Sequence, residues 1–320
     1  MTALADSLRR LSRPTSRQLQ DYGVYAAVVL IVLVNVAFTP NFLDAGNIRT
    51  QLLQVAPVVI VALGMALVIG TEGIDLSVGS VMALAAAVLP LYLGYGLLPA
   101  LLMVLVVAAA VGVVNGYLLA VAGLQPIVAT LGMLVAGRGL ALVIADGQLK
   151  QVGNEALLSI GSADVGGVPV IVLVTLVVAG AIGVLVHRTT FGRQLVAVGG
   201  NRAASRMAGL PVVRILVTTY VVCAVLSGVA GVLATARLTA SDPSAIGQLM
   251  ELSAITAVVV GGTPLSGGRV RVLGTVAGAL LMQLVRATLI KHNLPDSTAQ
   301  IIQAAIILGA VYVARERSSR

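Results

Sequence analysis

Residues 187–214 read HRTTFGRQLVAVGGNRAASRMAGLPVVR and contain five arginines, in a chain of 320 residues of which only 10% are charged. This polar stretch lies between two apolar runs, 168–186 and 215–236. Each run is about as long as a helix needs to be to cross the hydrocarbon core of a bilayer. The arrangement predicts two membrane-spanning helices joined by a cytoplasmic loop.

The remainder of the chain is also strongly apolar. Hydrophobic residues make up 58% of the sequence, and the mean hydropathy is +1.05. Continuous apolar runs favour helices, because the strands of a membrane barrel alternate in polarity. We therefore predict an all-α, polytopic transmembrane helix bundle of about ten spans, at residues 22–38, 52–70, 75–95, 97–121, 124–144, 168–186, 213–236, 251–263, 272–290 and 298–314.

Glycines inside these runs recur at spacings of three or four residues. Three pairs stand out: Gly112 and Gly116, Gly228 and Gly231, and Gly274 and Gly278. Such spacing lets helix backbones approach closely, although glycine is also frequent in membrane helices generally.

The basic residues indicate the topology. With ten spans that begin inside, fourteen of the twenty Lys and Arg residues fall in inside segments, four fall outside, and Arg138 and Arg286 lie within spans. This bias predicts that both termini are cytoplasmic. Topology and attraction to anionic membrane lipid account for the net charge of +8, so no nucleic-acid partner is implied.

The predicted organisation has three parts. Residues 1–20 form a basic cytoplasmic arm, residues 21–315 the transmembrane domain with the cytoplasmic loop 187–214, and residues 316–320 a cytoplasmic tail. The arm is either an amphipathic interfacial helix or a disordered segment.

The residues needed for catalysis or metal binding are not clustered in this sequence. The two lysines, Lys150 and Lys291, are outside any phosphate-binding loop pattern, and the single cysteine, Cys223, lies in an apolar run. The two histidines, His187 and His292, fall at opposite membrane faces in the predicted topology. We expect no catalytic residue, metal site or cofactor, and ATP hydrolysis, if it drives transport, in a separate chain.

The loop 187–214 contains the signals of a short helix. Asn201 is a favourable N-cap, Gly209 suits the left-handed position after a helix, and Pro211 prevents its continuation. The helix is either a solvated interfacial helix or a peg that inserts its apolar side into a cytoplasmic partner. Its two faces carry Arg202 and Arg206 on one side, and Ala203, Met207 and Leu210 on the other.

A second polar stretch, 71–80 (TEGIDLSVGS), lies between two apolar runs. Acidic groups near membrane depth are costly and usually face a cavity or a partner. One interpretation is a lining for a hydroxyl-rich substrate, formed by Glu72, Asp75, Ser77 and Ser80; the other is that Asp75 and Ser77 cap a helix.

Glu251 begins a later span and has a similar ambiguity. Its carboxylate either favours a helix N-terminus through the helix dipole or pairs with Arg138 or Arg286. We interpret Arg286, which is near the outer end of its run, as reaching toward the membrane interface.

Four segments carry a more specific pattern. In order, they are Gly73–Ser80 (GIDLSVGS); Asn115-Gly116 with Ala129–Gly132 and Arg138-Gly139; Thr190–Arg193 with Ala197–Asn201, Ala203-Ala204 and Gly209; and Gly247-Gln248 with Glu251-Leu252, Ala254-Ile255 and Gly261–Thr263 with Gly267–Arg269. Together they resemble the ribose/xylose-type permease subunits of bacterial ABC sugar importers, over roughly residues 40–315. The chain departs from that pattern at Gln125–Ile127, at Ser253 in place of Asp, and at Pro264 and Val270.

The resemblance implies a multi-pass subunit of the bacterial inner (plasma) membrane. Its partners would be a cytoplasmic ABC ATPase subunit, a second permease subunit that is identical or related, and a periplasmic or lipid-anchored sugar-binding protein. It implies an ATPase-coupling segment with Phe191, Gly192, Arg193, Asn201, Ala203, Ala204 and Gly209, to which the short helix adds Arg202, Arg206 and Met207. For the substrate pathway we expect Asn115 together with Glu72, Asp75, Ser77, Ser80 and Glu251.

A different class of function is a stand-alone secondary transporter or channel for a small polar solute. Such carriers often contain helices broken at Gly or Pro, as this chain does. A capped cytoplasmic helix favours the importer, because a stand-alone carrier has no use for a docking peg.

Overall fold

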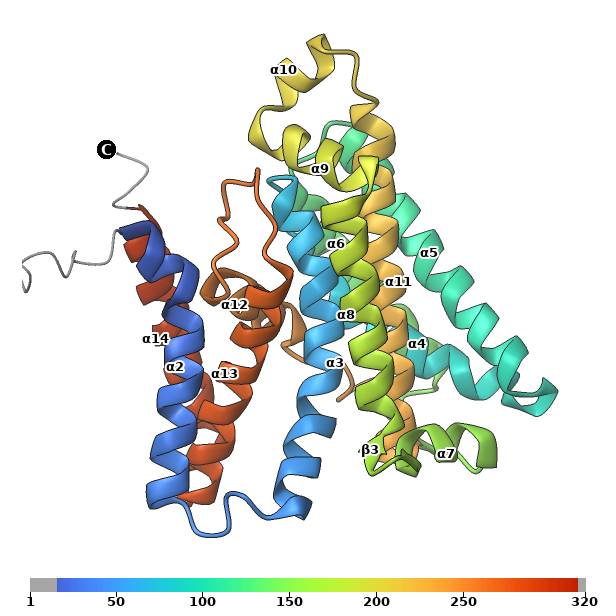
Figure 1. The fold of residues 1–320 in the computed structure, drawn as a ribbon. Helices are drawn as coiled ribbons and strands as arrows, with labels where there is room; N and C mark the ends of the chain where they lie inside the picture. Colours follow the sequence, from blue (N-terminus) through green and yellow to red (C-terminus); the bar gives the residue numbers. More distant parts are fainter. Residues whose placement is uncertain (1–15, 316–320) are drawn as a thin grey trace, which may run out of the picture.

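The computed structural model describes residues 16–315, which are predominantly helical (Figure 1). The longer helices are α2 (Ser16–Phe38), α3 (Ala45–Gly70), α4 (Val78–Tyr92), α5 (Leu97–Ala120), α6 (Pro126–Ile144), α8 (Val170–Arg188), α11 (Val212–Leu238), α13 (Val272–Lys291) and α14 (Asp296–Arg315). The shorter elements are η1 (Leu93–Tyr95), α7 (Glu155–Ser162), α9 (Thr190–Gly200), α10 (Arg202–Met207), α12 (Met250–Val260), β1 (Lys150–Gln151), β2 (Asp164–Val165), β3 (Val168–Pro169) and β4 (Ala240–Ser241).

The all-α, polytopic class is confirmed, and each of the ten predicted stretches contains a helix. Within the described residues, seven helical segments are long and apolar enough to cross a membrane: α3, α4 with η1, α5, α6, α8, α11 and α13. Residues 22–38 of α2 and helix α12 are apolar but shorter. The 11 residues of α12 rise only about 16 Å, roughly half of a hydrocarbon core.

Three helices form the centre of the bundle. The most apolar windows of α3, α4 and α11 are 83%, 67% and 67% buried, whereas those of α5, α6 and α8 are 28%, 22% and 22% buried. A helix that is apolar all round is stable inside the protein or against lipid. The first three helices therefore form the protein core, and the last three leave apolar surface available to lipid or to another membrane subunit.

Close backbone contacts explain the paired glycines. A Cβ on Gly112 or Gly116 would collide with the α11 backbone at Val221 or Val217. A Cβ on Gly278 would likewise collide with the Ala257 carbonyl oxygen of α12. The predicted close approach of helices is confirmed at these positions, where only a hydrogen atom fits.

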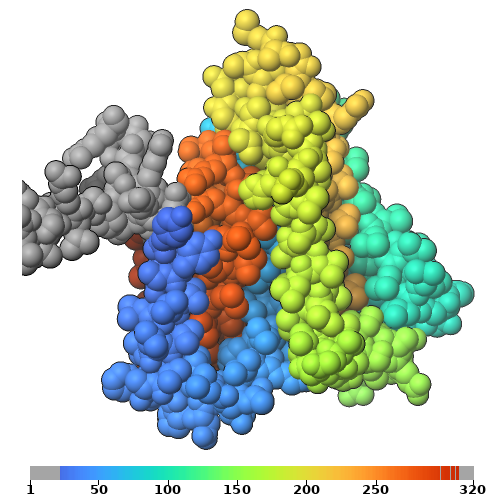
Figure 2. Space-filling model, in the orientation of Figure 1, coloured from blue at the N-terminus to red at the C-terminus, as the bar shows by residue number. Residues whose placement is uncertain are grey.

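The two ends of the bundle differ in structure. Helices α9 and α10 project from one end, and Figure 2 shows them as a knob above the packed helices. Helix α7 and the pair β2–β3 lie at the other end. There an ion pair between Arg49 and Asp164, with an N–O distance of 3.0 Å, joins the start of α3 to the segment after α7.

The predicted arm and tail lie mostly outside the described residues. Residues 16–20 of the arm begin α2, while residues 1–15 and 316–320 are not described. Helix α2 packs against α13 on one side of the bundle, and α13 also contacts α14 (Figure 1).

Candidate functional site

The loop 187–214 folds into two capped helices. The Thr189 hydroxyl accepts a hydrogen bond from the Gly192 amide (3.2 Å) at the start of α9, and the Asn201 side chain accepts one from the Ala204 amide (2.9 Å) at the start of α10. Gly209 has φ +78°, the left-handed value expected after a helix end. The short helix and both of its caps are confirmed, but the sequence analysis did not identify α9 as a second helix.

The exposed side of α10 is partly apolar. Met207 is 91% exposed, and Ala203, Ala204, Arg206 and Gly209 are exposed beside it. A methionine held in solvent at the tip of a projecting helix is typical of a contact surface, because Met adapts to many partner shapes.

The other side of α10 faces its own protein. The Arg202 guanidinium is half-buried and donates a hydrogen bond of 3.1 Å to the Thr71 carbonyl oxygen, just after α3. Arg202 and Arg206, which we expected on one face of the helix, differ in exposure: the end of α3 covers Arg202, whereas Arg206 is exposed. Of the α9 residues, Phe191 packs against the core, Gly192 is buried and Arg193 is exposed.

Three glycines fix α9 to the membrane helices. The Gly268 amide donates to the Gly70 carbonyl oxygen at 3.0 Å, and a Cβ on Gly199 would collide with that same oxygen. Residues 261–271, which we call the glycine loop, join α12 to α13. The ends of α9, of α3 and of the glycine loop therefore meet at one junction without intervening side chains.

The polar stretch 71–80 forms a buried hydrogen-bonded network with Asn115. The Ser77 hydroxyl donates to the Asp75 carboxylate at 2.6 Å and accepts from the Asn115 amide at 2.8 Å. The Ser80 hydroxyl donates to the Ser77 carbonyl oxygen at 2.8 Å. All four side chains are 0% exposed, so in this conformation the network holds α4 against α5. Their role in a substrate pathway stays a prediction.

The remaining two predicted pathway residues lie elsewhere. Glu72 is exposed at the turn after α3, with φ +65°, close to Gly267 of the glycine loop. Glu251 is half-buried in the first turn of α12, and its carboxylate lies against Gly79 at the start of α4. The structure thus brings together Asp75, Ser77, Ser80 and Asn115, but not these two glutamates.

Arg138 organises the place where α4 and α12 begin. Its Nη1 donates to the carbonyl oxygens of Pro243 and Ile246 at 2.7 Å each, and its Nη2 to that of Gly79 at 3.4 Å. The direct hydrogen bonds of Arg138 therefore go to backbone oxygens, although Glu251 reaches the same glycine.

Residues 242–246, which Arg138 contacts, form a hydrogen-bonded turn. The Ser244 hydroxyl and amide donate to the Asp242 carboxylate, and these hydrogen bonds hold the pKa of Asp242 below its usual value. Asp242 is therefore ionised at neutral pH, and its carboxylate stabilises the turn by accepting backbone amides.

A cavity of about 680 Å³ lies beside this turn. This volume is within the range of roughly 300–1,000 Å³ of small-molecule sites. Six helices and the turn line it: Gln54, Pro57 and Val58 of α3; Met82 of α4; Ala234, Arg237 and Leu238 of α11; residues 245–249 of the turn; Met250, Leu252 and Ser253 of α12; Gln283, Arg286 and Ile290 of α13; and Ala299, Gln300 and Ala304 of α14.

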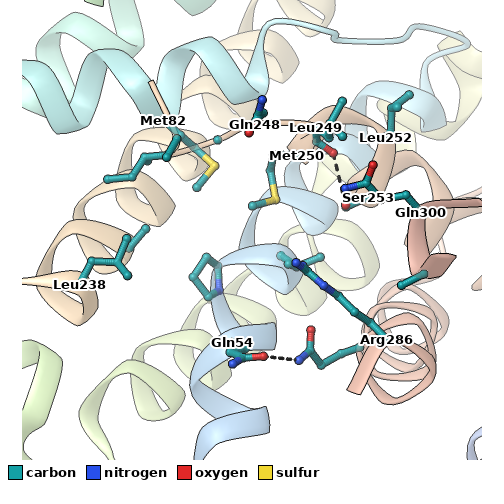
Figure 3. Close-up of a pocket in the computed structure, with 18 of the residues that line it drawn as sticks. Gln54, Met82, Leu238, Gln248, Leu249, Met250, Leu252, Ser253, Arg286 and Gln300 are labelled. Carbon is teal, nitrogen blue, oxygen red and sulfur yellow. Dashed lines mark hydrogen bonds between the residues drawn. The ribbon is translucent and has the colours of Figure 1, made fainter. Parts of the chain in front are cut away.

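The polar part of this lining comes from residues that the sequence analysis did not select. Arg286 lines the cavity (Figure 3), and its reach toward the membrane interface stays a prediction. The Gln283 amide donates to Gln54 and to Gln51 at 2.8 Å each, which fixes the amides of α3 and α13. None of the six predicted pathway residues is in the lining. The one feature of the sequence that could have indicated this lining was the presence of glutamines and arginines inside apolar runs.

Comparisons with known proteins identify the family. Residues 47–311 match the family model described as the branched-chain amino acid transport system / permease component. The fructose import permease protein FruF of Bifidobacterium longum is 38% identical over 88% of this chain and 84% of its own length. The ribose import permease protein RbsC of Escherichia coli is 37% identical over 92% of this chain and 93% of its own length. The L-arabinose ABC transporter permease protein AraH of Azospirillum brasilense is 31% identical over 92% of this chain and 87% of its own length.

No solved structure matches the chain. The resemblance seen in the sequence is confirmed by the family match and by these relatives, each of which aligns with almost the whole chain. The chain therefore belongs to the family of branched-chain amino acid transport system permease components, and is a multi-pass permease of the bacterial inner membrane.

Proposed function

We propose that this chain is the pore-forming permease subunit of an ATP-driven importer for a monosaccharide. The observation that carries the proposal is the likeness, over nine-tenths of the chain, to permeases named for fructose, ribose and L-arabinose. ATP is hydrolysed by a separate cytoplasmic ABC ATPase subunit. A periplasmic or lipid-anchored sugar-binding protein delivers the substrate, and a second permease subunit, identical or related, completes the pore.

In this proposal residues 21–315 cross the membrane ten times, with both termini in the cytoplasm. The end that carries α9 and α10 is cytoplasmic, and the end that carries α7 faces the binding protein. The distribution of arginines supports this orientation. The apolar part of α2, residues 22–38, and the short helix α12 both count as spans. Helix α12 packs against α3 and α13, and a short helix inside the protein needs no full crossing of lipid.

The exposed side of α10, with Ala203 and Met207, docks into the ATPase subunit. Movement of that subunit then reaches the membrane through two contacts, the Arg202–Thr71 hydrogen bond and the junction of Gly199, Gly70 and Gly268. Both contacts end on α3 or on the glycine loop, and α3, α12 and α13 all line the cavity. A rigid shift of α10 is in this way coupled to the walls of the substrate site.

The cavity holds the sugar during transport. Its glutamines offer both hydrogen-bond donors and acceptors, which is the chemistry that sugar hydroxyls require. Two short helices, α4 and α12, begin beside the cavity, and the segments at their starts meet where Gly79 lies against Gly247. Secondary transporters place substrate sites at such interruptions, because helix ends and unwound backbone groups are available there to bind the substrate. The same reason applies to the ends of α4 and α12.

The test replaces Met207, the exposed methionine of α10 that is proposed to contact the ATPase subunit. We expect Met207→Asp to reduce co-purification of the ATPase subunit, and ATP-dependent sugar uptake, by about tenfold or more, because the carboxylate would be buried in an apolar contact. Ser159→Asp, at an exposed position of α7 at the other end, is the matched control and should leave co-purification of the ATPase subunit unchanged.

Uptake that continues in vesicles without any ATPase chain would contradict the proposal. That result would instead favour a stand-alone carrier, in which the broken helices α4 and α12 bind the coupling ion.

A further inference from the structure

The buried network of Asp75, Ser77 and Asn115 lacks one hydrogen. The Asn115 amide donates to the Ser77 hydroxyl at 2.8 Å, and this hydroxyl donates to the Asp75 Oδ1 atom at 2.6 Å. The other oxygens of the same two planar groups, Asp75 Oδ2 and Asn115 Oδ1, are both buried and have no hydrogen-bond partner. An ionised carboxylate and an amide oxygen only accept hydrogen bonds, so neither can satisfy the other without a further proton.

The Asp75 carboxyl also lacks a compensating charge. Asp75 is 0% exposed, and no Lys or Arg of the described chain forms a hydrogen bond or an ion pair with it. The groups of α11 that interact with it are the Tyr220 hydroxyl and the Cys223 thiol, both of which are uncharged at neutral pH. The Arg202 guanidinium acts on Tyr220 but donates its hydrogen bond to the Thr71 carbonyl oxygen. A carboxylate buried in this way costs free energy that a bound proton removes.

Neighbouring segments supply no other titratable group to this cluster. From α5 the contact is the Asn115 amide, which does not titrate. Glu72, three residues before Asp75, is exposed at the turn after α3 and lies against the glycine loop. The charge on Asp75 is therefore decided within the cluster itself.

We propose that Asp75 is a proton-binding site, in which the carboxyl group is neutral at pH 7 and its Oδ2 atom donates a hydrogen bond to Asn115 Oδ1. The proton closes a ring of three hydrogen bonds, to which the carboxyl, the Ser77 hydroxyl and the amide contribute one hydrogen each. The count is the same if the amide is turned the other way, because the hydroxyl and the amide still supply only two of the three. Hydrogen bonds joined in a ring polarise and strengthen one another.

The ring holds the start of α4 in place. Ser77 is the residue before α4, Asn115 belongs to α5, and Gly79, two residues further on, lies against Gly247 of the turn beside the cavity. Loss of the proton would leave two acceptors without a donor and a buried charge, which separates α4 from α5 at this point. The inference goes beyond the proposed function, because it holds whatever molecule the permease carries.

Infrared spectroscopy of the purified full-length permease detects the proton directly. A neutral carboxyl group has a C=O stretching band that is separate from the bands of a carboxylate. At pH 7 we expect such a band in the wild type and its loss in Asp75→Asn, which replaces the carboxyl by a neutral group of the same shape. Asp242→Asn is the matched control and should keep the band, because Asp242 is ionised at neutral pH.

A second variant keeps the experiment decisive if Asp75→Asn does not fold. Asn115→Leu keeps the carboxyl and removes its acceptor, so the band should remain and move to higher wavenumber. A spectrum in which neither Asp75→Asn nor Asn115→Leu changes a neutral carboxyl band would overturn the inference.

The pH dependence of stability measures the same proton independently. Above the ordinary pKa of an exposed Asp, about 3.9, the folded wild type would bind one proton more than the unfolded chain, so its stability falls as the pH rises. From about pH 5 to about pH 8 we expect the unfolding midpoint of the wild type to fall relative to Asp75→Asn, by about 2–4 °C per pH unit. Relative to Asp242→Asn it should stay constant apart from that same fall, because Asp242 is ionised in both states.

The same measurement separates a proton from a cation. Exchanging N-methylglucamine chloride for sodium or potassium chloride at pH 7 should leave the difference between the wild type and Asp75→Asn unchanged. If either salt stabilises the wild type but not the variant, a monovalent cation occupies the site and the inference is wrong. A difference between these two proteins that does not vary with pH would show an ionised carboxylate and would equally refute it.

Discussion

At the scale of single residues, the polar groups inside this protein divide into two kinds. Asp75, Ser77 and Asn115 hydrogen-bond to one another within the packed core, at distances of 2.6–2.8 Å, while the Asp75 Oδ2 and the Asn115 Oδ1 atoms are buried without a hydrogen-bond partner. Arg237 and Arg286 instead face a cavity. The sequence suggested the first group for a substrate pathway because acidic and hydroxyl groups between apolar runs are unusual. Composition alone does not tell which polar groups find partners in the core.

The network around Ser77 makes a prediction about stability. Ser77→Ala removes the donor to Asp75 and the acceptor for Asn115, both of which are 0% exposed. We expect a loss of about 1–3 kcal/mol in the free energy of unfolding, because two buried polar groups lose a partner. Thermal unfolding of the purified permease in detergent measures it.

Ser159→Ala is the matched control for that experiment. The Ser159 hydroxyl is exposed and bonds only to a carbonyl of its own helix, at Ala156. Its removal should shift the free energy of unfolding by less than about 0.5 kcal/mol. Equal unfolding midpoints for the two variants would mean that the Ser77 network does not hold α4 in place.

At the scale of helices, contacts between glycines and neighbouring backbones set the spacing of the core. Helix α5 approaches α11 at Gly112 and Gly116, and α13 approaches α12 at Gly274 and Gly278. The pairs were visible in the sequence, but their partners were not. Gly132 also lies inside an apolar run, yet nothing lies within 4 Å of a Cβ built on it.

This difference gives a paired prediction. Gly112→Leu should destabilise the permease by about 1–3 kcal/mol or more, because its side chain would collide with the α11 backbone at Val221. Gly132→Leu, in exposed helix surface, should be neutral or slightly stabilising, since glycine is a poor helix former. The unfolding midpoints of both variants test this prediction. Destabilisation by Gly132→Leu but not by Gly112→Leu would contradict the close contact between α5 and α11 at Gly112.

At the scale of the whole molecule, the two ends of the bundle differ in structure. The knob of α9 and α10 touches the membrane helices through backbone junctions at α3 and the glycine loop. The cavity is walled by α3, α12 and α13, together with α4, α11 and α14. Because α3 runs from the junction to the cavity, one rigid element connects the surface proposed for the ATPase to the site proposed for the sugar.

This arrangement requires a definite orientation in the membrane. In a Cys223→Ala background, Met207→Cys should react with a membrane-impermeant maleimide only when the reagent reaches the cytoplasm. Glu155→Cys in α7 should react from outside in intact spheroplasts. The physical reason is that the arginine-rich segments stay on the cytoplasmic side. The reverse labelling pattern would overturn the orientation and the ten-span topology together.

The helical membrane class, the positions of the long apolar helices and the capped short helix after Asn201 could be predicted from the sequence, whereas helix α9 could not. These depend on interactions within a few residues: apolar runs long enough for a bilayer, a side chain that caps an amide two or three residues on, and a glycine with positive φ. Family membership was also readable, because the four segments of the pattern are local.

The tertiary structure alone decided where the polar side chains go. The cavity joins Gln54 to Gln300 across six helices, and Arg202 is covered by the end of α3, 131 residues earlier in the chain. Helix periodicity assigns a face to each residue but not the neighbour that the face will meet. Which charged groups become buried partners and which line a cavity is therefore fixed only when the helices pack.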